Sequence, residues 1–462
     1  MCKRFTRQLL SAIIIGGFIC ITVSKSDAIP AFSREHNTEC ATCHTIFPAL
    51  NEYGNVFMKN GFVWTKQKKD DASTKPAAKN AVKGEGDQEK QRNKEVSSGT
   101  ASPKEEEPLL GAPRKSEPLW LAGLPQTVPL SLSAALNASY NDDASYDKLD
   151  LSTRAISLLA GGVFRAKLAF YLKYNLYAEG EFDPAVSNTP LNASPPNAND
   201  LQEFYLVWRN TFDTPVNIKA GRLQPALSLW KKSDKVGISD FVTTSFRVGA
   251  STFSADAAED AIEANAVLFD RLFVAAGVVD RNGQDSNEGY GHISLKIGGA
   301  DFKGKEPDID LDKESIYDYM YLVLGGYVYY GRNSDSLASN ERNYFYRTGA
   351  EMDLVIKNAR LKVAYAREHD NNADFAVPHD EQSTDALAAQ AEYMFTPDLI
   401  AYARYELLNP GDGGSVQRYI PGIAFAPIQN TKVTFEYQHV ADNTDSSNGD
   451  SNLYLLGIRV AF

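Results

Sequence analysis

Five consecutive residues near the amino terminus carry the clearest chemical signal in the chain. They read Cys40-Ala41-Thr42-Cys43-His44. Two cysteines separated by two residues and followed at once by a histidine form the pattern at which haem is attached covalently in c-type cytochromes. The two thiols form thioether bonds to the porphyrin, and the adjacent imidazole is the proximal ligand of the iron. The pattern predicts one haem c, tethered by Cys40 and Cys43 and ligated by His44. A structural disulfide or a redox dithiol is the alternative, but neither gives a role to the histidine.

The distal ligand of that iron remains open in the sequence. Met58 is the candidate, because it is the only methionine near the motif, and Met/His ligation raises the reduction potential. His36 is the alternative, and a side chain from the rest of the chain is the third choice. If residues 44–58 formed one helix, His44 and Met58 would lie about 21 Å apart, too far to ligate one iron. We therefore expect the chain to bend at Gly54. The competing interpretation of Met58 is an ordinary core methionine.

Residues 1–28 have the features of a cleaved signal peptide. Three basic residues among the first seven precede an apolar run over residues 9–23. Ser26 and Ala28 then place small residues at the −3 and −1 positions of a cleavage site. An uncleaved anchor helix is the alternative. We expect export across the inner membrane, with removal of two of the four cysteines, Cys2 and Cys20.

Two short regions follow the signal peptide. Residues 29–64 form the predicted monohaem cytochrome c segment, in which four apolar residues recur at helical spacing: Phe47, Leu50, Tyr53 and Phe57. A segment below about 40 residues seldom builds a self-sufficient core, so this one needs an outside wall. Residues 65–118 are rich in Lys and Glu and almost lack aromatic residues. That composition predicts a disordered charged linker, with a lysine-rich docking tail as the alternative.

Residues 119–462 alternate between apolar and polar positions in the manner of a membrane β-barrel. The last strand is the clearest, with apolar residues on one face at Tyr454, Leu456, Ile458, Val460 and Phe462. A terminal phenylalanine on such a strand resembles the signal that the barrel assembly machinery recognises. The alternation predicts sixteen antiparallel strands, an even number as a bacterial barrel requires. They lie near 128–140, 150–162, 168–180, 200–211, 215–225, 259–269, 271–281, 289–299, 316–332, 344–357, 359–369, 384–396, 399–408, 415–427, 431–441 and 452–462.

The connections between these strands alternate in length, as short periplasmic turns and long outer loops would. We expect 226–258 to be one of the long outer loops. The connection at 300–315 is long where a short turn is due, and the sequence offers no reason for it. Five charged residues are expected to line the lumen: Arg347, Glu351, Asp353, Arg404 and Glu406. The alternative fold is a large soluble β-sandwich or propeller, which would not show an even number of strands joined by alternating short and long connections.

Composition excludes several classes of protein. The net charge of −12 argues against nucleic acid as a partner, because a surface that tracks phosphates needs excess Lys and Arg. After residue 28 no stretch approaches the roughly 20 apolar residues of a spanning helix. The predicted fold class is all-β: a 16-stranded antiparallel porin-like barrel in the outer membrane, in contact with its lipid, with a small N-terminal helical cytochrome segment.

Together these features resemble the fused outer-membrane monohaem cytochrome-porins, the ferrous-iron-oxidising outer-membrane cytochromes c of neutrophilic and acidophilic bacteria. Beyond the barrel, the resemblance is carried by Ile29-Pro30-Ala31-Phe32-Ser33-Arg34, Cys40-Ala41-Thr42-Cys43-His44-Thr45-Ile46-Phe47-Pro48, Leu50-Asn51, Gly54, Phe57 and Asn60-Gly61-Phe62. In that family the haem segment runs more directly into the first strand, whereas here some fifty polar residues intervene. Whether the haem segment lies inside the pore or hangs beneath it is therefore open.

The resemblance implies an electron-transfer function. One haem would accept electrons from an extracellular donor, with Fe(II) the expected donor, and pass them to periplasmic c-type cytochromes. Such a protein would be an electron-transfer cytochrome whose one enzymatic activity is the oxidation of ferrous iron. Electron transfer makes and breaks no covalent bond, so it needs no general acid or base. Two alternatives remain: outward electron transfer to acceptors such as metal oxides, and a solute porin with a haem-bearing plug. A high, Met-ligated potential favours iron oxidation, and a low bis-histidine potential favours export of electrons.

Overall fold

The computed structural model describes the barrel strands and one short N-terminal segment. The described residues are 42–63, 130–142, 148–164, 167–178, 200–230, 235–246, 248, 253–280, 288–305, 315–334, 342–375, 377, 380–411, 414–428, 430–444 and 449–461. The predicted signal peptide, the predicted linker, Cys40 and His36 lie outside them. Among the described residues, no helix is long and apolar enough to cross a membrane.

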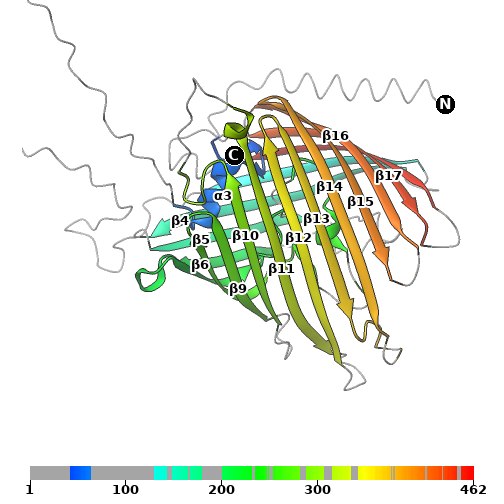
Figure 1. Ribbon diagram of the computed structural model, residues 1–462. Coiled ribbons are helices and arrows are strands. Elements are labelled where there is room, and N and C mark those ends of the chain that lie inside the picture. Colours follow the sequence, from blue (N-terminus) through cyan, green and yellow to red (C-terminus); the bar gives the residue numbers. More distant parts are fainter. Residues whose placement is uncertain are drawn as a thin grey trace, which may run out of the picture.

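Sixteen antiparallel strands form a closed barrel, in which the last strand pairs with the first (Figure 1). The strands are β3 Leu130–Asn141, β4 Leu149–Phe164, β5 Leu168–Ala178, β6 Asp200–Trp208, β7 Val216–Leu223, β8 Glu259–Leu268, β9 Leu272–Asp280, β10 Glu288–Gly298, β11 Met320–Ser334, β12 Arg342–Ile356, β13 Ala359–Asp370, β14 Gln382–Thr396, β15 Leu399–Pro410, β16 Val416–Ile428, β17 Thr431–Asp442 and β18 Ser451–Ala461. Each of the sixteen predicted ranges overlaps one of these strands. The largest difference is at β11, which begins four residues late because Ile316–Tyr319 form a 3₁₀ helix.

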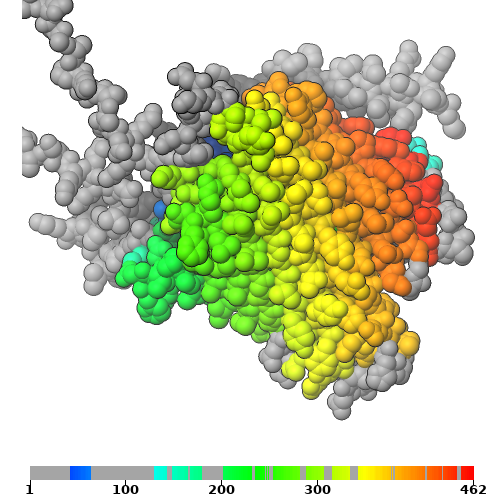
Figure 2. Space-filling view, in the orientation of Figure 1, coloured from blue at the N-terminus to red at the C-terminus, as the bar shows by residue number. Residues whose placement is uncertain are grey.

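The direction of the side chains shows that the barrel faces lipid. Along β17 the polar residues point inward and are buried, whereas Phe435 on the opposite face is 46% exposed. The buried set is Lys432, Thr434, Glu436 and Gln438. A soluble barrel would place these faces the other way round, because its apolar side chains would fill the interior. Figure 2 shows the outer wall as a continuous surface from the green strands to the red ones.

Tight connections gather at one end of the barrel, which we call the turn end. They join β4 to β5, β8 to β9, β12 to β13, β14 to β15 and β16 to β17. By the rule for outer-membrane barrels the turn end faces the periplasm. The five charged residues predicted to line the lumen are all buried, as expected for inward-facing positions: Arg347, Glu351, Asp353, Arg404 and Glu406.

The long connection between β7 and β8 folds into the lumen, so its prediction as an outer loop is wrong for the residues described. We call its described residues (224–230, 235–246, 248 and 253–258) the inward loop. Its Trp230, Phe241 and Phe246 are buried, since they pack against a wall lined with alanines. Backbone N–H groups of the loop donate to carboxylates of the wall: Ala226 to Glu263, Leu229 to Glu351, Ile238 and Ser239 to Glu436, and Val242 to Glu406. The loop leaves the solvent because its aromatic side chains need apolar cover.

Phe241→Ala tests this packing. The ring of Phe241 lies 5.4 Å from that of Trp230 and 4.8 Å from the Arg404 guanidinium. Removal of the ring leaves a cavity, so we expect the free energy of unfolding to fall by about 3 kcal/mol. Denaturant titration in detergent micelles measures this change. The control is Phe435→Ala on the lipid face, which opens no cavity in the lumen. Equal losses in the two variants would contradict the packing described.

Candidate functional site

The haem-motif region begins with a short hairpin and continues as one helix. Strands β1 (His44–Ile46) and β2 (Ala49–Leu50) pair across Phe47-Pro48, whose peptide bond is cis, and helix α3 spans Glu52–Lys59. The expected helical stretch is therefore wrong at Phe47 and Leu50. Proline lacks an N–H and restricts the residue before it, so a helix cannot run through this point. The chain turns in the hairpin, before Gly54.

Asn51 and Gly54 hold the helix against the haem motif. The backbone N–H of Asn51 donates to the Cys43 carbonyl at 3.0 Å, and its side-chain amide donates to the Thr42 carbonyl at 3.1 Å. The same side chain caps α3 by accepting from the Gly54 N–H at 2.9 Å. A Cβ on Gly54 would lie 2.1 Å from the Cys43 carbonyl oxygen. Gly54 is therefore not the predicted bend, and its glycine is required by close backbone contact.

The imidazole of His44 is oriented by its own hairpin. Its Nδ1 lies 3.0 Å from the carbonyl oxygen of Pro48. Because a carbonyl can only accept, Nδ1 carries the proton and Nε2 carries the lone pair. The Phe47 ring meets the imidazole edge-on, with centroids 5.3 Å apart. This is the arrangement by which proteins fix a metal-binding histidine, with one nitrogen bonded to a carbonyl and the other able to ligate.

Residues 42–63, which we call the N-terminal segment, pack inside the barrel. Ile46 and Ala49 are 3% and 0% exposed, and they contact β15 and β16 through Ile400, Tyr402, Ile420 and Ala424. Phe57 and Phe62 pack instead on β5, β6 and β7, where Phe62 stacks on Tyr171 at 5.7 Å. These two groups of strands are well apart in the barrel order. The segment therefore reaches from wall to wall in the lumen, and Figure 1 shows α3 in blue within the ring of strands.

The unexplained long connection between β10 and β11 holds the end of this segment at the turn end. The side-chain amide of Asn60 donates to the Phe302 carbonyl at 2.8 Å, and Lys59 lies over the Phe302 ring at 5.3 Å. Arg209, in the turn after β6, donates from Nε to the Asn60 carbonyl at 2.6 Å. Burial lowers the pKa of the Arg209 guanidinium from its ordinary value, although arginine remains cationic at physiological pH. Near the same end of the barrel, Lys296 forms an ion pair with Glu52.

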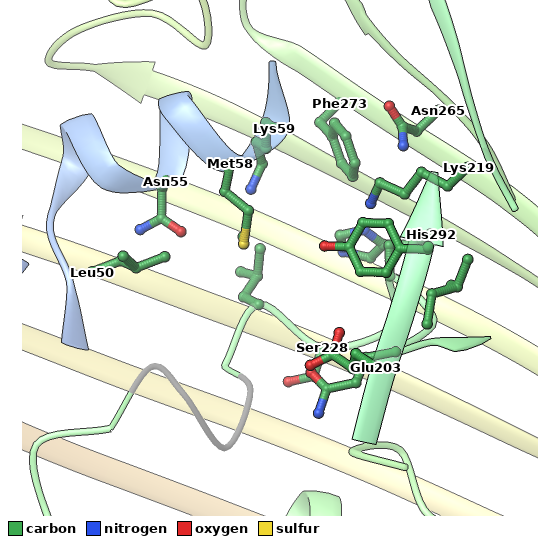
Figure 3. Close-up of a pocket in the computed structure, with 15 residues that line it drawn as sticks. Leu50, Asn55, Met58, Lys59, Glu203, Lys219, Ser228, Asn265, Phe273 and His292 are labelled. Atoms are coloured by element: carbon green, nitrogen blue, oxygen red, sulfur yellow. The ribbon is translucent and has the colours of Figure 1, made fainter. Parts of the chain in front are cut away.

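A small cavity of about 70 Å³ lies between the N-terminal segment, the inward loop and the barrel wall. This is well below the roughly 300–1,000 Å³ of ligand pockets in proteins. Eight of its fifteen lining side chains are polar or charged, and Figure 3 shows Met58 of the segment and His292 of β10 in the lining. The lining residues are Leu50, Asn55, Met58, Lys59, Glu203, Tyr205, Lys219, Leu223, Gln224, Ala226, Ser228, Leu229, Asn265, Phe273 and His292.

The structure describes three of the five predicted site residues. Met58 lines the cavity, and it lies one helical turn after Gly54, on the helix face that approaches Cys43. Cys43 is half-buried. His44 does not line the cavity, but it pairs in the hairpin with Leu50, which does. Cys40 and His36 lie outside the described residues.

The sequence analysis missed the residues that receive the segment. Arg209, Lys296 and Phe302 are separated from the motif by some 150 residues or more, and a single sequence gives no sign of such contacts. The only available signal was the unusual length of the β10–β11 connection. Among the described residues there is no cluster of three or more His, Cys, Asp or Glu side chains that could hold a metal ion.

Comparison with known proteins identifies the barrel alone. No protein-family profile and no curated protein matches the chain. Among solved structures, the anion-selective porin from Comamonas acidovorans is similar at 12% identity and TM-score 0.51, over 73% of this chain and 99% of that one. The chain is also similar to OmpT of Vibrio cholerae, at 14% identity and TM-score 0.46, over 73% of this chain and 99% of that one. It is similar as well to the outer membrane channel DcaP of Acinetobacter baumannii, at 12% identity and TM-score 0.47, over 72% of this chain and 97% of that one. The chain has the fold of a porin-like barrel.

Arg209→Ala tests the attachment at the turn end. The variant removes the hydrogen bond to the Asn60 carbonyl and the side chain that covers Gly61. A Cβ built on Gly61 would lie 3.0 Å from the Cδ of Arg209. A hydrogen bond from a charged group contributes about 1.5–3 kcal/mol, so we expect the segment to leave the lumen more often. Single-channel recordings in planar bilayers should then show more frequent open events than the wild type.

The matched control for this variant is Lys167→Ala. Lys167 forms an exposed ion pair with Asp213 at 2.8 Å at the same end of the barrel, without touching the segment. Its removal should leave the recordings unchanged. If Arg209→Ala also behaves like the wild type, Arg209 does not retain the segment.

Proposed function

We propose that this protein is an electron conduit of the outer membrane. A single haem c, attached to Cys40 and Cys43 and ligated by His44, would accept electrons from extracellular Fe(II) and donate them to periplasmic c-type cytochromes. The observation that carries the proposal is the position of the N-terminal segment, which packs between opposite walls of the barrel. A redox centre held inside the barrel would have less of the roughly 30 Å hydrocarbon core left to cross than a centre held below it.

The described residues fit a covalently bound haem. The proton of His44 is on Nδ1, toward the Pro48 carbonyl, so the nitrogen that must ligate iron has its lone pair. Cys43 is held by Asn51 at the start of α3. The cavity of about 70 Å³ beside Met58 is too small for a porphyrin, so the attached haem would need more room than this cavity gives. When bound, the haem supplies a one-electron carrier that alternates between ferrous and ferric iron.

The barrel supplies what the segment lacks. The segment is too short to enclose a large apolar group, and Tyr205, Leu223 and Phe273 of the wall provide apolar cover on the far side of the cavity. The inward loop excludes water from the neighbouring part of the lumen through Trp230 and Phe241. A filled lumen lets electrons pass while it limits the passage of solutes.

Met58 is supported as a distal ligand by its place on the cavity, and His36 remains the alternative from the sequence. The identity of this ligand bears on the direction of electron flow. Methionine would raise the potential and suit the oxidation of Fe(II), whereas a second histidine would lower it and suit outward transfer to metal oxides.

A solute porin with a haem-bearing plug is the second candidate function. The observation that favours it is the likeness of the barrel to an anion-selective porin. Conductance separates the two candidates, since an electron conduit with a filled lumen should conduct few ions with or without Fe(II), whereas a porin should open.

Reduction of the purified protein by Fe(II) tests the main proposal. We expect a haem that survives denaturation and acid–acetone extraction, as thioether attachment requires. Rapid mixing of the ferric protein with Fe(II), at the working pH of the organism, should produce the ferrous absorbance spectrum. Failure of Fe(II) to reduce the haem would overturn the inward direction, and absence of covalent haem would overturn the conduit itself.

Gly54→Ala tests the contact between α3 and the haem motif. The added methyl group would overlap the Cys43 carbonyl, so either the helix or the motif must move. Overpacking of this kind costs about 1–3 kcal/mol, and we expect a lower yield of covalent haem per folded barrel. The measurement is the ratio of haem absorbance to protein after purification.

Gly449→Ala is the matched control, because a Cβ there meets nothing within 4 Å. It should leave the haem yield at the wild-type value. A normal yield in Gly54→Ala would mean that the close contact does not position Cys43 for attachment.

A further inference from the structure

We propose that the N-terminal segment and the inward loop form one two-part plug, in which each part holds the other inside the lumen. Neither part would then open alone, and the pore would pass from closed to open in a single cooperative step. The proposal concerns the packing of this chain and does not depend on the attachment of haem. It gives the filled lumen a gate, which electron transfer by itself does not require.

The hairpin end of the segment shares a buried cluster with the inward loop. Ile46 and Ala49 of the hairpin and Val236 of the loop belong to one apolar cluster against β15 and β16, and Val236 is 1% exposed. The backbone carbonyl of Val236 accepts a hydrogen bond from Lys432 Nζ at 2.8 Å. Departure of the hairpin would uncover Val236, which is unfavourable because apolar surface returns to water.

The helical end of the segment meets the loop a second time. Phe57 and Phe62 lie in the same apolar cluster as Leu227 of the loop, which is 0% exposed. Phe253, near the other end of the loop, belongs to this cluster as well. Because the two shared clusters involve opposite ends of the segment, the loop supports the segment on both sides of the lumen.

The small cavity lies where the two parts face each other. Its lining includes Met58 and Lys59 of α3 together with Ser228 and Leu229 of the loop, and Figure 3 shows the first three of these around it. At about 70 Å³ the cavity leaves the two parts close together.

One carboxylate of the wall serves both parts of the plug. Glu351 of β12 accepts a hydrogen bond from the backbone N–H of Leu229 and lies within electrostatic reach of Lys59. Asp256 of the loop brings a second negative charge to the same place. Lys59 is therefore a counter-charge for the carboxylate that holds the loop. Departure of the segment would remove this cation, and a buried carboxylate that loses a cation is unfavourable.

The loop has a separate attachment to the wall, which allows each part to be loosened on its own. Trp230, Phe241 and Phe246 pack against the alanines of β13 and β14. Among the described residues, that cluster contains none from the N-terminal segment. Phe241→Ala therefore loosens the loop away from the segment, whereas Arg209→Ala loosens the segment at Asn60.

Hydrogen–deuterium exchange of the full-length protein in detergent micelles, measured by mass spectrometry of its peptides, tests the coupling. Arg209→Ala should raise exchange in the inward loop as well as in residues 42–63. Phe241→Ala should raise exchange in residues 42–63 as well as in the loop. We expect a rise of about fivefold or more in the unaltered part, and coupling of equal size in both directions, as linkage between two sites requires. The controls, Lys167→Ala and Phe435→Ala, should change neither part.

Increased exchange confined to the altered part in both variants would overturn the proposal. Because Phe241→Ala can fail to fold, the unaltered protein gives a second test at high pH, where exchange is limited by the rate of opening. There the two parts should exchange with one rate constant, as a single cooperative unit does. Two clearly different opening rates would refute the two-part plug. A protein that passes these tests but carries no covalent haem would refute the proposed function and leave this inference intact.

Discussion

The N-terminal segment is too small to bury its own apolar side chains, and the rest of the structure depends on how that cover is supplied. Residues 42–63 contain one eight-residue helix and a two-stranded hairpin, neither of which is stable alone. Ile46 and Ala49 find cover on one side of the barrel, and Phe57 and Phe62 find it on the other. The barrel thus acts as the hydrophobic core of a segment that has none, and the segment in turn fills the lumen.

The polar groups of the inner wall form hydrogen bonds with the parts of the chain that occupy the lumen. Carboxylates of the wall, including Glu263, Glu406 and Glu436, receive backbone N–H groups of the inward loop, so these buried acceptors keep hydrogen-bond partners. At the turn end, Arg209 and the Phe302 carbonyl bond Asn60 at the end of the segment. A solute porin needs an open path in this region, whereas here two parts of the chain occupy it.

The fold could be predicted from the sequence because strand alternation is a local signal. Each strand shows a lipid face and a lumen face within its own ten or so residues, as β17 does with Phe435 outside and Glu436 inside. Pro48 stops the predicted helix by local backbone chemistry, which apolar periodicity alone does not report. The close contact of Gly54 with Cys43 depends on tertiary structure, so its glycine could not be explained from the sequence. The inward loop was misplaced for a similar reason: its length suggested an outer loop, and only the alanine-lined wall explains why Trp230 and Phe241 lie inside. The Cys40–His44 motif could be found from spacing alone. The residues that hold its segment, Arg209, Lys296 and Phe302, could not, because they come from distant strands and turns.

Electron transfer across a sealed membrane tests the central claim most directly. The protein would be reconstituted into liposomes that contain ferric cytochrome c and an ion-sensitive dye, and Fe(II) would be added outside. The account predicts reduction of the enclosed cytochrome without a change in the dye signal, because the N-terminal segment and the inward loop occupy the lumen. Reduction that occurs only together with ion leakage, or no reduction at all in vesicles that contain the haem-loaded protein, would contradict it.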